Sequence, residues 1–287
     1  MLQIDQHQIE SETGEPSPRF TEGDESMKIA VYQMELIPGS PQENREKVSR
    51  WVESQVKEDL PDIIVLPEMW TTSYVLEQLD LIADESSEPT KSFLSDLAKK
   101  HQINIVGGSI ANKVNDKIYN TSLILDRNGD LVHEYSKIHL VPMLNEPAYL
   151  TGGEETVQTF ELDGIRMGVI ICYDLRFPEL ARKLALDGAQ VLFIPAEWPK
   201  PRTNHWVNLQ IARAIENQMY VISSNNVGSL EGVEYTGASL IVDPWGEVLA
   251  KGSENYEETL RGNVNPEKVL EVRRNVPVFE SRVPDLY

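Results

Sequence analysis

Residues 165–198 read IRMGVIICYDLRFPELARKLALDGAQVLFIPAEW and contain a complete strand–helix–strand unit. An apolar run ends in Cys172, a segment with helical apolar spacing follows, and a second apolar run begins at Val191. Gly188 comes directly after the expected helix, at the position where glycine commonly forms a C-cap. Two buried-type strands joined by a helix are typical of an α/β fold.

The segments on either side continue this alternation. We expect strands at 28–34, 62–68, 103–110 and 220–225, and helices at 40–57, 90–101 and 203–218. Ser40, Pro41 and Glu43 predict a capping box with proline at the first helical position, and Thr203 is the expected cap of the helix that begins there. Two hairpins are expected to turn at 127–130 and at 244–246, which predicts mixed rather than purely parallel sheets.

The chain as a whole has the composition of a globular protein. Of its 287 residues 40% are hydrophobic and 25% are charged, and no linker-like segment divides 27–287, so we expect one domain there. The stretch after Leu260 looks irregular. Residues 1–26 contain seven acidic residues and one arginine with little apolar periodicity, which predicts a disordered acidic extension.

Composition also excludes several classes of partner. A net charge of −20 argues against nucleic acids and anionic membranes, since phosphate groups are bound by clustered lysines and arginines. No apolar stretch approaches the roughly 20 residues that span a bilayer. The N-terminus does not resemble a secretory signal, so the expected location is the cytoplasm.

Three expected strands end in a reactive side chain, namely Glu68, Lys137 and Cys172. Each has a common structural explanation when taken alone: a loop carboxylate, a surface lysine and a buried thiol. Together they suit nucleophilic catalysis, because a carboxylate can deprotonate a thiol and an ammonium can stabilise an oxyanion. Cys172 lies at a strand-to-helix turn, where a helix N-terminus would favour the thiolate. The backbone N–H of Tyr173 is a natural second oxyanion donor.

The same positions carry a family resemblance. The segments LPEMW (66–70), EYSKIHL (134–140) and GVIICYDLRFPE (168–179) resemble the three signature blocks of the nitrilase superfamily of carbon–nitrogen hydrolases, in that family's order. The similarity extends over 28–287, including AEWPKPRTNHWVNLQIARAIENQMYV and GASLIVDPWGEVL. It implies a four-layer αββα sandwich. It also implies a homodimer formed through the faces that carry the helix after the cysteine and a neighbouring helix.

The resemblance assigns roles to four residues. It implies that Glu68 is the general base, Lys137 the oxyanion stabiliser and Cys172 the nucleophile of an amidase that works through a thioester. Glu146 lies about where many members carry a second glutamate. This loop lacks the Phe-Asp that many relatives have after the His-Leu of the lysine block, which puts its substrate contacts in doubt more than the triad. No metal or organic cofactor is implied.

Within the superfamily the chain most resembles the omega-amidases, which hydrolyse 2-oxo acid monoamides such as 2-oxoglutaramate and 2-oxosuccinamate. Such substrates carry a carboxylate, so Arg176 and Arg202 are candidate partners for it, with an ordinary ion pair as the alternative for each. Tyr74 either lines the pocket or packs in the core. The rival functions are an amidase for N-carbamoyl compounds or other short aliphatic amides, a non-catalytic binding protein, and a redox thiol protein.

A metal site finds little support in the sequence. His133, His139 and His205 have no helical metal-ligand spacing and no accompanying cluster of acids or cysteines. Because Cys172 is the only cysteine, the chain cannot form an internal disulfide or a cysteine-pair metal site.

Overall fold

The structure, a computed structural model, describes residues 26–286. The predicted disordered extension therefore lies, apart from Ser26, outside the described residues. The predicted start of the first strand is confirmed, since β1 runs over Met27–Gln33.

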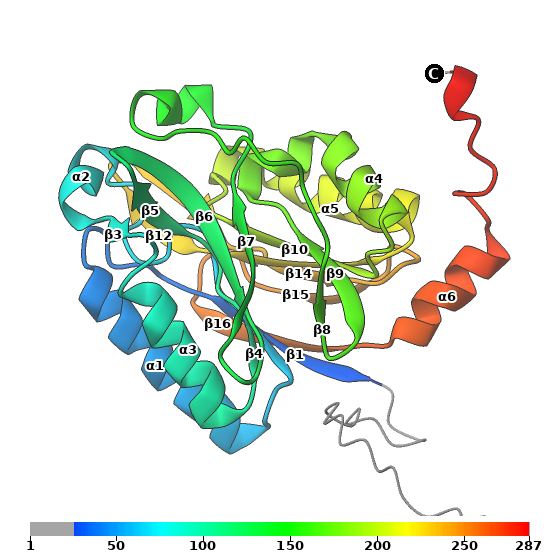
Figure 1. Cartoon of the computed structure of the whole chain (residues 1–287), viewed down its shortest axis with the longest axis horizontal. Helices are drawn as coiled ribbons and strands as arrows, with labels where there is room; N and C mark the ends of the chain where they lie inside the picture. The colour runs from blue at the N-terminus through cyan, green and yellow to red at the C-terminus, as the bar shows by residue number, and fades with distance from the viewer. Residues whose placement is uncertain (1–25, 287) are drawn as a thin grey trace, which may run out of the picture.

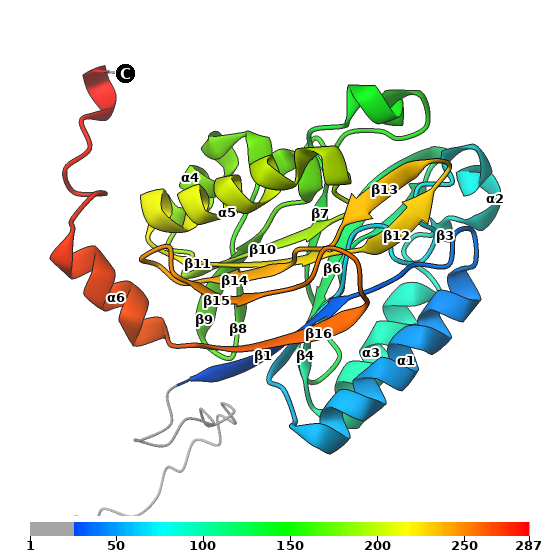
Figure 2. The ribbon, with the colours of Figure 1, turned by 180° about the vertical axis from the view of Figure 1, so that it is seen from behind.

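Two mixed sheets form the centre of the described chain (Figure 1). The first has eight strands, in the order β16 (Glu258–Val264), β1, β2 (Ile63–Val65), β4 (Asn104–Val106), β6 (Lys117–Leu125), β5 (Ile110–Val114) and β3 (Asp84–Glu85), with β7 (Leu131–Ser136) pairing β6. The second has six described strands, in the order β15 (Val248–Lys251), β14 (Leu240–Val242), β11 (Tyr220–Asn225), β10 (Val191–Ala196), β9 (Ile165–Val169) and β8 (Phe160–Leu162). A separate hairpin of β12 (Val227–Leu230) and β13 (Val233–Thr236) lies at the end of the sheets where β3 is found (Figure 2).

Helices cover the outer face of each sheet. α1 (Pro41–Glu58) and α3 (Thr90–His101) lie on the first sheet, and α4 (Pro178–Leu186) and α5 (Thr203–Asn217) lie on the second (Figures 1 and 2). The short helix α2 (Leu79–Ile82) and the C-terminal helix α6 (Pro266–Asn275) lie outside these layers. In the described range, no helix is long and apolar enough to cross a bilayer.

The alternation of side chains along β1 explains the four layers. Ile29 and Val31 belong to the large core between the two sheets, whereas Ala30 and Tyr32 belong to the core shared with α1 and α3. Tyr32 stacks on Trp51 of α1 with ring centroids 4.4 Å apart. Since successive strand residues point to opposite faces, one strand with both faces apolar must be covered twice. The four-layer αββα architecture expected from the resemblance is confirmed.

The predicted start of α1 is confirmed in position, with Ser40 as the N-cap residue and Pro41 as the first helical residue, but the capping box is absent, and the predicted cap of α5 is wrong. The Ser40 side chain caps none of the described backbone N–H groups of α1, and its Oγ points to Pro38 O at 3.5 Å. Asn44 stabilises this start instead, because its amide accepts from Ile37 N and donates to Ile37 O and Thr71 O. Thr203 is the first helical residue of α5 rather than its cap, and its hydroxyl donates to Lys200 O.

The stretch after Leu260 is regular as far as Asn275, contrary to expectation, and irregular and mostly exposed over 276–286, as expected. Residues Glu258–Val264 form β16, which pairs antiparallel with all seven residues of β1, and α6 follows at once. The Asn265 side chain accepts a hydrogen bond from Glu267 N, and Pro266 occupies the first helical position. An Asn-Pro pair in these positions is a helix start signal that was present in the sequence.

The expected strand 103–110 is interrupted at Gly107 and Gly108. Gly108 has φ +62°, and a Cβ atom there would lie 2.0 Å from Pro67 O. Only glycine fits so close to a neighbouring carbonyl. The break lets Ser109 N donate to Pro67 O at 3.0 Å, which holds the loop that follows β2.

Candidate active site

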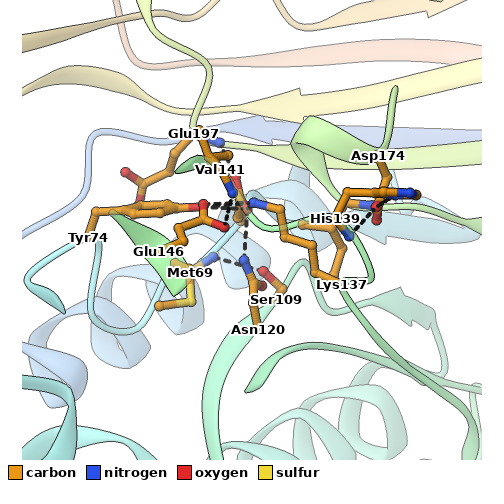
Figure 3. A network of polar contacts seen from close by, with 12 residues as sticks. Met69, Tyr74, Ser109, Asn120, Lys137, His139, Val141, Glu146, Asp174 and Glu197 are labelled. Atoms are coloured by element: carbon orange, nitrogen blue, oxygen red, sulfur yellow. Dashed lines mark hydrogen bonds and ion pairs between the residues drawn. The ribbon is translucent and has the colours of Figure 1, made fainter. Parts of the chain in front are cut away.

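A buried network of charged and polar side chains lies where β2 and β7 end in the first sheet and β9 and β10 end in the second. Lys137 Nζ lies 2.9 Å from Glu68 Oε1 and 2.9 Å from Glu146 Oε1, and all three side chains are inaccessible to solvent. Figure 3 shows Lys137, Tyr74 and Glu146 converging from different directions. The structure thus brings together three of the four residues expected at the catalytic centre, and Cys172 adjoins them.

The carboxylate of Glu68 is held on both oxygens. Oε1 accepts hydrogen bonds from Tyr74 Oη (2.7 Å), Asn120 Nδ2 (2.8 Å) and Lys137 Nζ (2.9 Å). Oε2 accepts one from the backbone N–H of Glu197 at 2.7 Å. A carboxylate that accepts hydrogen bonds from several donors has a fixed orientation. A general base needs such an orientation because it must face the one atom that it deprotonates.

Glu146 and Tyr74 complete the far side of the network. Glu146 Oε2 accepts from Val141 N at 2.8 Å, and the Tyr74 hydroxyl lies 2.7 Å from Glu68 and 2.8 Å from Glu146. Burial raises the pKa of Glu146, with Lys137 opposing the rise and Glu68 adding to it. A hydroxyl has one proton to donate, so Tyr74 donates to one of the two carboxylates at a time. Lys137 donates to both Glu68 and Glu146 and balances their charge.

Lys137 is charged despite its burial. Burial alone would lower the pKa of Lys137, but the charges of Glu68 and Glu146 outweigh it and hold the pKa above its ordinary range. Tyr74 packs in an apolar cluster with Met69 and Leu79 and does not line the cavity over Cys172. Burial, followed by Glu146 and Glu68, raises the pKa of Tyr74, so it is a neutral hydrogen-bonding member of the network.

Cys172 lies at the turn that follows β9, as predicted, but the local structure differs from the prediction. Cys172–Arg176 is a 3₁₀ turn, and α4 starts only at Pro178. The thiol is therefore not at the N-terminus of an α-helix. Burial and then Glu68 raise the pKa of Cys172, which Lys137 only partly offsets, so the resting group is a thiol and needs a base.

The backbone of Cys172 has φ +47°, in the left-handed region that non-glycine residues rarely adopt. Asp174 holds this turn: one carboxylate oxygen accepts from Ile171 N (3.1 Å) and Tyr135 Oη (2.7 Å), and the other from His139 N (3.0 Å). The His139 ring also contacts Asp174, with Nδ1 at 2.8 Å. Contacts from two neighbouring elements therefore maintain a strained position, as is common at functional sites.

A small cavity opens directly over Cys172. It is lined by Val141, Met143, Leu144, Cys172, Tyr173, Arg176, Glu197, Trp198, Pro199 and Arg202. It contains three of the four residues expected to bind substrate, while Tyr74 lies in the network. A larger groove of about 710 Å³ elsewhere, lined by parts of β5–β7 and the loop 153–158, contains none of the predicted site residues.

The two arginines of this cavity are available to an anion. Neither Arg176 nor Arg202 forms an ion pair with any acid in the described part of the chain, so the ordinary ion pair considered for each is not found. Arg176 stacks over Trp198, with its Cζ 4.6 Å from the ring centroid, and its Nη1 lies 3.2 Å from His205 Nδ1. Stacking fixes the guanidinium without neutralising it.

Three contributing residues were not predicted. Glu197 follows the buried strand β10 directly, which is the same signal that pointed to Glu68, Lys137 and Cys172, so it could have been found. Asp174 lies two residues after the cysteine, and its role becomes visible only once Tyr135 and His139 are placed beside it. Asn120 lies in the middle of β6 and has no local signal, since a buried strand asparagine is recognisable only from its partner.

Comparisons with known proteins identify the family of the chain. The model of the family described as carbon–nitrogen hydrolase matches residues 28–274. The chain is 46% identical over 259 residues to a 2-oxoglutaramate amidase of Bacillus subtilis, covering 90% of this chain and 98% of that one. It is 34% identical over 281 residues to the omega-amidase NIT3 of Saccharomyces cerevisiae, covering 91% and 96%. Its fold matches the crystal structure of Saccharomyces cerevisiae Nit3, with TM-score 0.82, 32% identity, and 90% and 97% of the two chains covered.

Proposed function

The chain belongs to the carbon–nitrogen hydrolase family, whose members cleave non-peptide carbon–nitrogen bonds, and we propose that it is a cysteine-dependent amidase for a small amide that carries a carboxylate. The preferred substrates are 2-oxoglutaramate and 2-oxosuccinamate. The observation that carries the proposal is the convergence of Glu68, Lys137 and Cys172 beneath a cavity that holds two unpaired guanidinium groups. The similarity to a 2-oxoglutaramate amidase supports the substrate class.

The first step is proton transfer from Cys172 to Glu68. Oε1 of Glu68 already has three donors and Oε2 has one, so Oε2 has the lone pair that is free to accept the proton. The thiolate then attacks the amide carbonyl, and the C–S bond forms as the carbonyl π electrons move to oxygen. Because the pKa of the thiol is raised, transfer and attack are expected to be concerted.

Lys137 and the Tyr173 N–H then stabilise the oxyanion of the tetrahedral intermediate. The Lys137 contact to Tyr74 is its longest, at 3.2 Å, so the N–H that makes this contact is the one that can turn to the oxyanion. Protonated Glu68 gives its proton to the leaving nitrogen, the C–N bond breaks, and ammonia departs. Glu68 then deprotonates water, which hydrolyses the thioester to the carboxylic acid and restores the thiol.

The rival readings have less support. A non-catalytic binding protein would not need a base and a cation aimed at one buried thiol. A redox thiol has no second cysteine in the chain with which to form a disulfide. An N-carbamoyl or other short aliphatic amide hydrolase would use the same Glu68, Lys137 and Cys172, so it is the alternative that the substrate test must address.

The substrate is tested by ammonia release from a panel of 2-oxoglutaramate, 2-oxosuccinamate, glutamine, asparagine and N-carbamoyl amino acids. We expect kcat/KM for 2-oxoglutaramate to exceed that for glutamine by about 100-fold, because the 2-ammonium group of glutamine would lie near two guanidinium groups. Hydrolysis of N-carbamoyl amino acids with none of 2-oxoglutaramate would establish the alternative instead.

Arg176→Leu and Arg202→Leu test the carboxylate contact. For whichever arginine binds the carboxylate, KM for 2-oxoglutaramate is expected to rise about 10- to 100-fold, the size of a lost charge-assisted hydrogen bond. Hydrolysis of an uncharged short amide such as butyramide should change little. Arg274→Leu, at an exposed site outside the cavity, is the matched control. An equal loss on both substrates would show that the arginines act on the fold of the cavity rather than on the carboxylate.

The homodimer and the cytoplasmic location expected from the sequence stay predictions. Exposed apolar side chains at Leu186 of α4, Ile215 of α5 and Trp245, whose neighbour Gly246 lies against Ile215, support a dimer through this face, because a second copy would cover them. Sedimentation of the purified protein would test it.

A further inference from the structure

Glu197 is a third buried glutamate in the site, and the mechanism above does not use its side chain. It directly follows β10 in the second sheet, whereas Glu68 follows β2 in the first. The backbone N–H of Glu197 donates to Glu68 Oε2 at 2.7 Å, and its carboxyl Oε2 accepts from Ser73 Oγ at 3.2 Å. Ser73 belongs to the same loop as Glu68. One residue of the second sheet therefore holds two points of the loop that carries Glu68.

This loop needs to be held. Met69 and Ser73 both have positive φ, at 44° and 55°, and a non-glycine residue in that region is disfavoured unless its surroundings enforce it. Glu197 itself directly follows β10 of the second sheet, and its carboxyl is faced by Asn226, which follows β11 of the same sheet, and by Tyr235 of the separate β12–β13 hairpin. Glu197 thus joins the Glu68 loop to the second sheet at the level of the thiol and its base.

The surroundings of Glu197 disfavour a charge. The titratable groups that face it are Glu68, Tyr74 and Tyr235, and within the described chain no lysine, arginine or histidine forms an ion pair with it. Burial, reinforced by Glu68, raises the pKa of Glu197 well above its ordinary value, and the neighbouring polar groups of Tyr235, Ser73 and Asn226 offset this only partly. The single buried ammonium nearby, on Lys137, already serves Glu68 and Glu146.

We propose that Glu197 is a positioning residue that acts as a neutral carboxylic acid, clamping the Glu68 loop of the first sheet to the second sheet so that the base faces Cys172. An ionised Glu197 would place a second negative charge beside Glu68 and repel the group that it positions. The inference rests on the proposed function, in which Glu68 deprotonates Cys172. In this proposal the Glu197 carboxyl contributes to positioning and does not exchange a proton with substrate.

Alkylation of Cys172 by iodoacetamide, followed by intact mass, measures base positioning without any knowledge of the substrate. The chain has one cysteine, so every thioether formed reports on this site. Glu197→Gln keeps the shape and neutrality of the protonated acid and is expected to react within about twofold of the wild-type rate. Glu197→Ala is expected to react about tenfold more slowly, as a mispositioned base would. Glu254→Ala, at an exposed glutamate, is the matched control and should react like wild type.

The pH dependence of thermal stability gives a second test. A carboxyl that was ionised and only structural would not make the difference in Tm between wild type and Glu197→Gln change with pH. The folded-state pKa of Glu197 is raised, so folding requires its protonation once the pH exceeds the ordinary value of about 4.5. The wild-type protein therefore loses stability relative to Glu197→Gln as the pH rises from 5 to 8, and the difference in Tm should widen in favour of Gln. The alkylation rates of the two should stay equal over this range.

The outcomes separate the possibilities. Wild-type alkylation by Glu197→Ala would show that the carboxyl positions nothing. A Gln variant as slow as Ala, or a Tm difference that does not change with pH, would show that the carboxyl is ionised. Should Glu197→Ala fail to fold, Ser73→Ala removes one side of the clamp and is expected to slow alkylation about threefold, and an unchanged rate would overturn the proposal. Glu68→Gln tests the base itself: a wild-type rate there would refute the proposed function rather than the role of Glu197.

Discussion

Replacing Cys172 by alanine is expected to lower amidase turnover by about 10⁴-fold or more while leaving the fold intact. The thiol is the only group in the proposed mechanism that forms a covalent bond to substrate, and nothing else in the chain can replace it. The side chain is small and contributes little to the core, and the Asp174 contacts that hold the turn use the backbone of neighbouring residues. Ammonia release and thermal unfolding of the same sample measure both parts of this prediction.

Cys172→Ser is the matched control for the loss of turnover in Cys172→Ala. It preserves the shape of the side chain, but a hydroxyl is far less acidic than a thiol in the same buried position, so turnover should remain strongly reduced. Mass spectrometry of wild type during turnover should show the added mass of the acyl group, and neither variant should show it. Turnover by Cys172→Ala close to that of wild type would rule out the covalent mechanism.

Replacing Lys137 by methionine is expected to remove activity and to cost about 3–5 kcal/mol of the free energy of unfolding. Glu68 and Glu146 would lose the cation that each contacts at 2.9 Å and would stay buried beside one another. One of these two carboxylates must then bind a proton for the variant to fold. The loss in the free energy of unfolding relative to wild type should therefore become smaller as the pH falls toward the ordinary pKa of a carboxyl group, near 4.3. Urea unfolding at pH 7 and pH 5 measures it.

A double variant and a surface control sharpen this test. Lys137→Met combined with Glu68→Gln removes one of the stranded carboxylates and should be more stable than Lys137→Met alone. Lys91→Met breaks an exposed ion pair to Glu88 at 3.0 Å and should cost at most about 1 kcal/mol. Stability losses of equal size for Lys91→Met and Lys137→Met would contradict the account of a buried, cation-dependent network.

The sequence allowed the outline of the site to be predicted because its key residues end apolar runs. Glu68 and Lys137 follow strands of the first sheet that run in the same direction, so their ends meet at one edge. Cys172 follows a strand of the second sheet, whose end faces that edge. Burial patterns of strands and helices are local, which is why most elements were placed correctly. The strand end at Glu197 gave the same signal.

The remaining features depend on distant partners. β16 is an edge strand with a glycine in it and polar residues on its exposed side, and the strand that orders it, β1, lies more than 200 residues earlier in the chain. Asn120 and Asp174 acquire their roles only from side chains on other elements. At the start of α1 the side-chain hydrogen bonds come from Asn44 and not from Ser40. One of them goes to the carbonyl of Thr71, which is too distant in the sequence for a helix-capping rule to predict.

The division of this site between two sheets has a consequence for how the molecule works as a whole. The base and its lysine belong to one β layer, and the nucleophile belongs to the other. Neither layer holds a functional half that could act alone, so the chemistry exists only where the two surfaces meet. The reaction rate therefore depends on how accurately one layer is aligned with the other, and it reports on tertiary structure that a probe of secondary structure alone would miss.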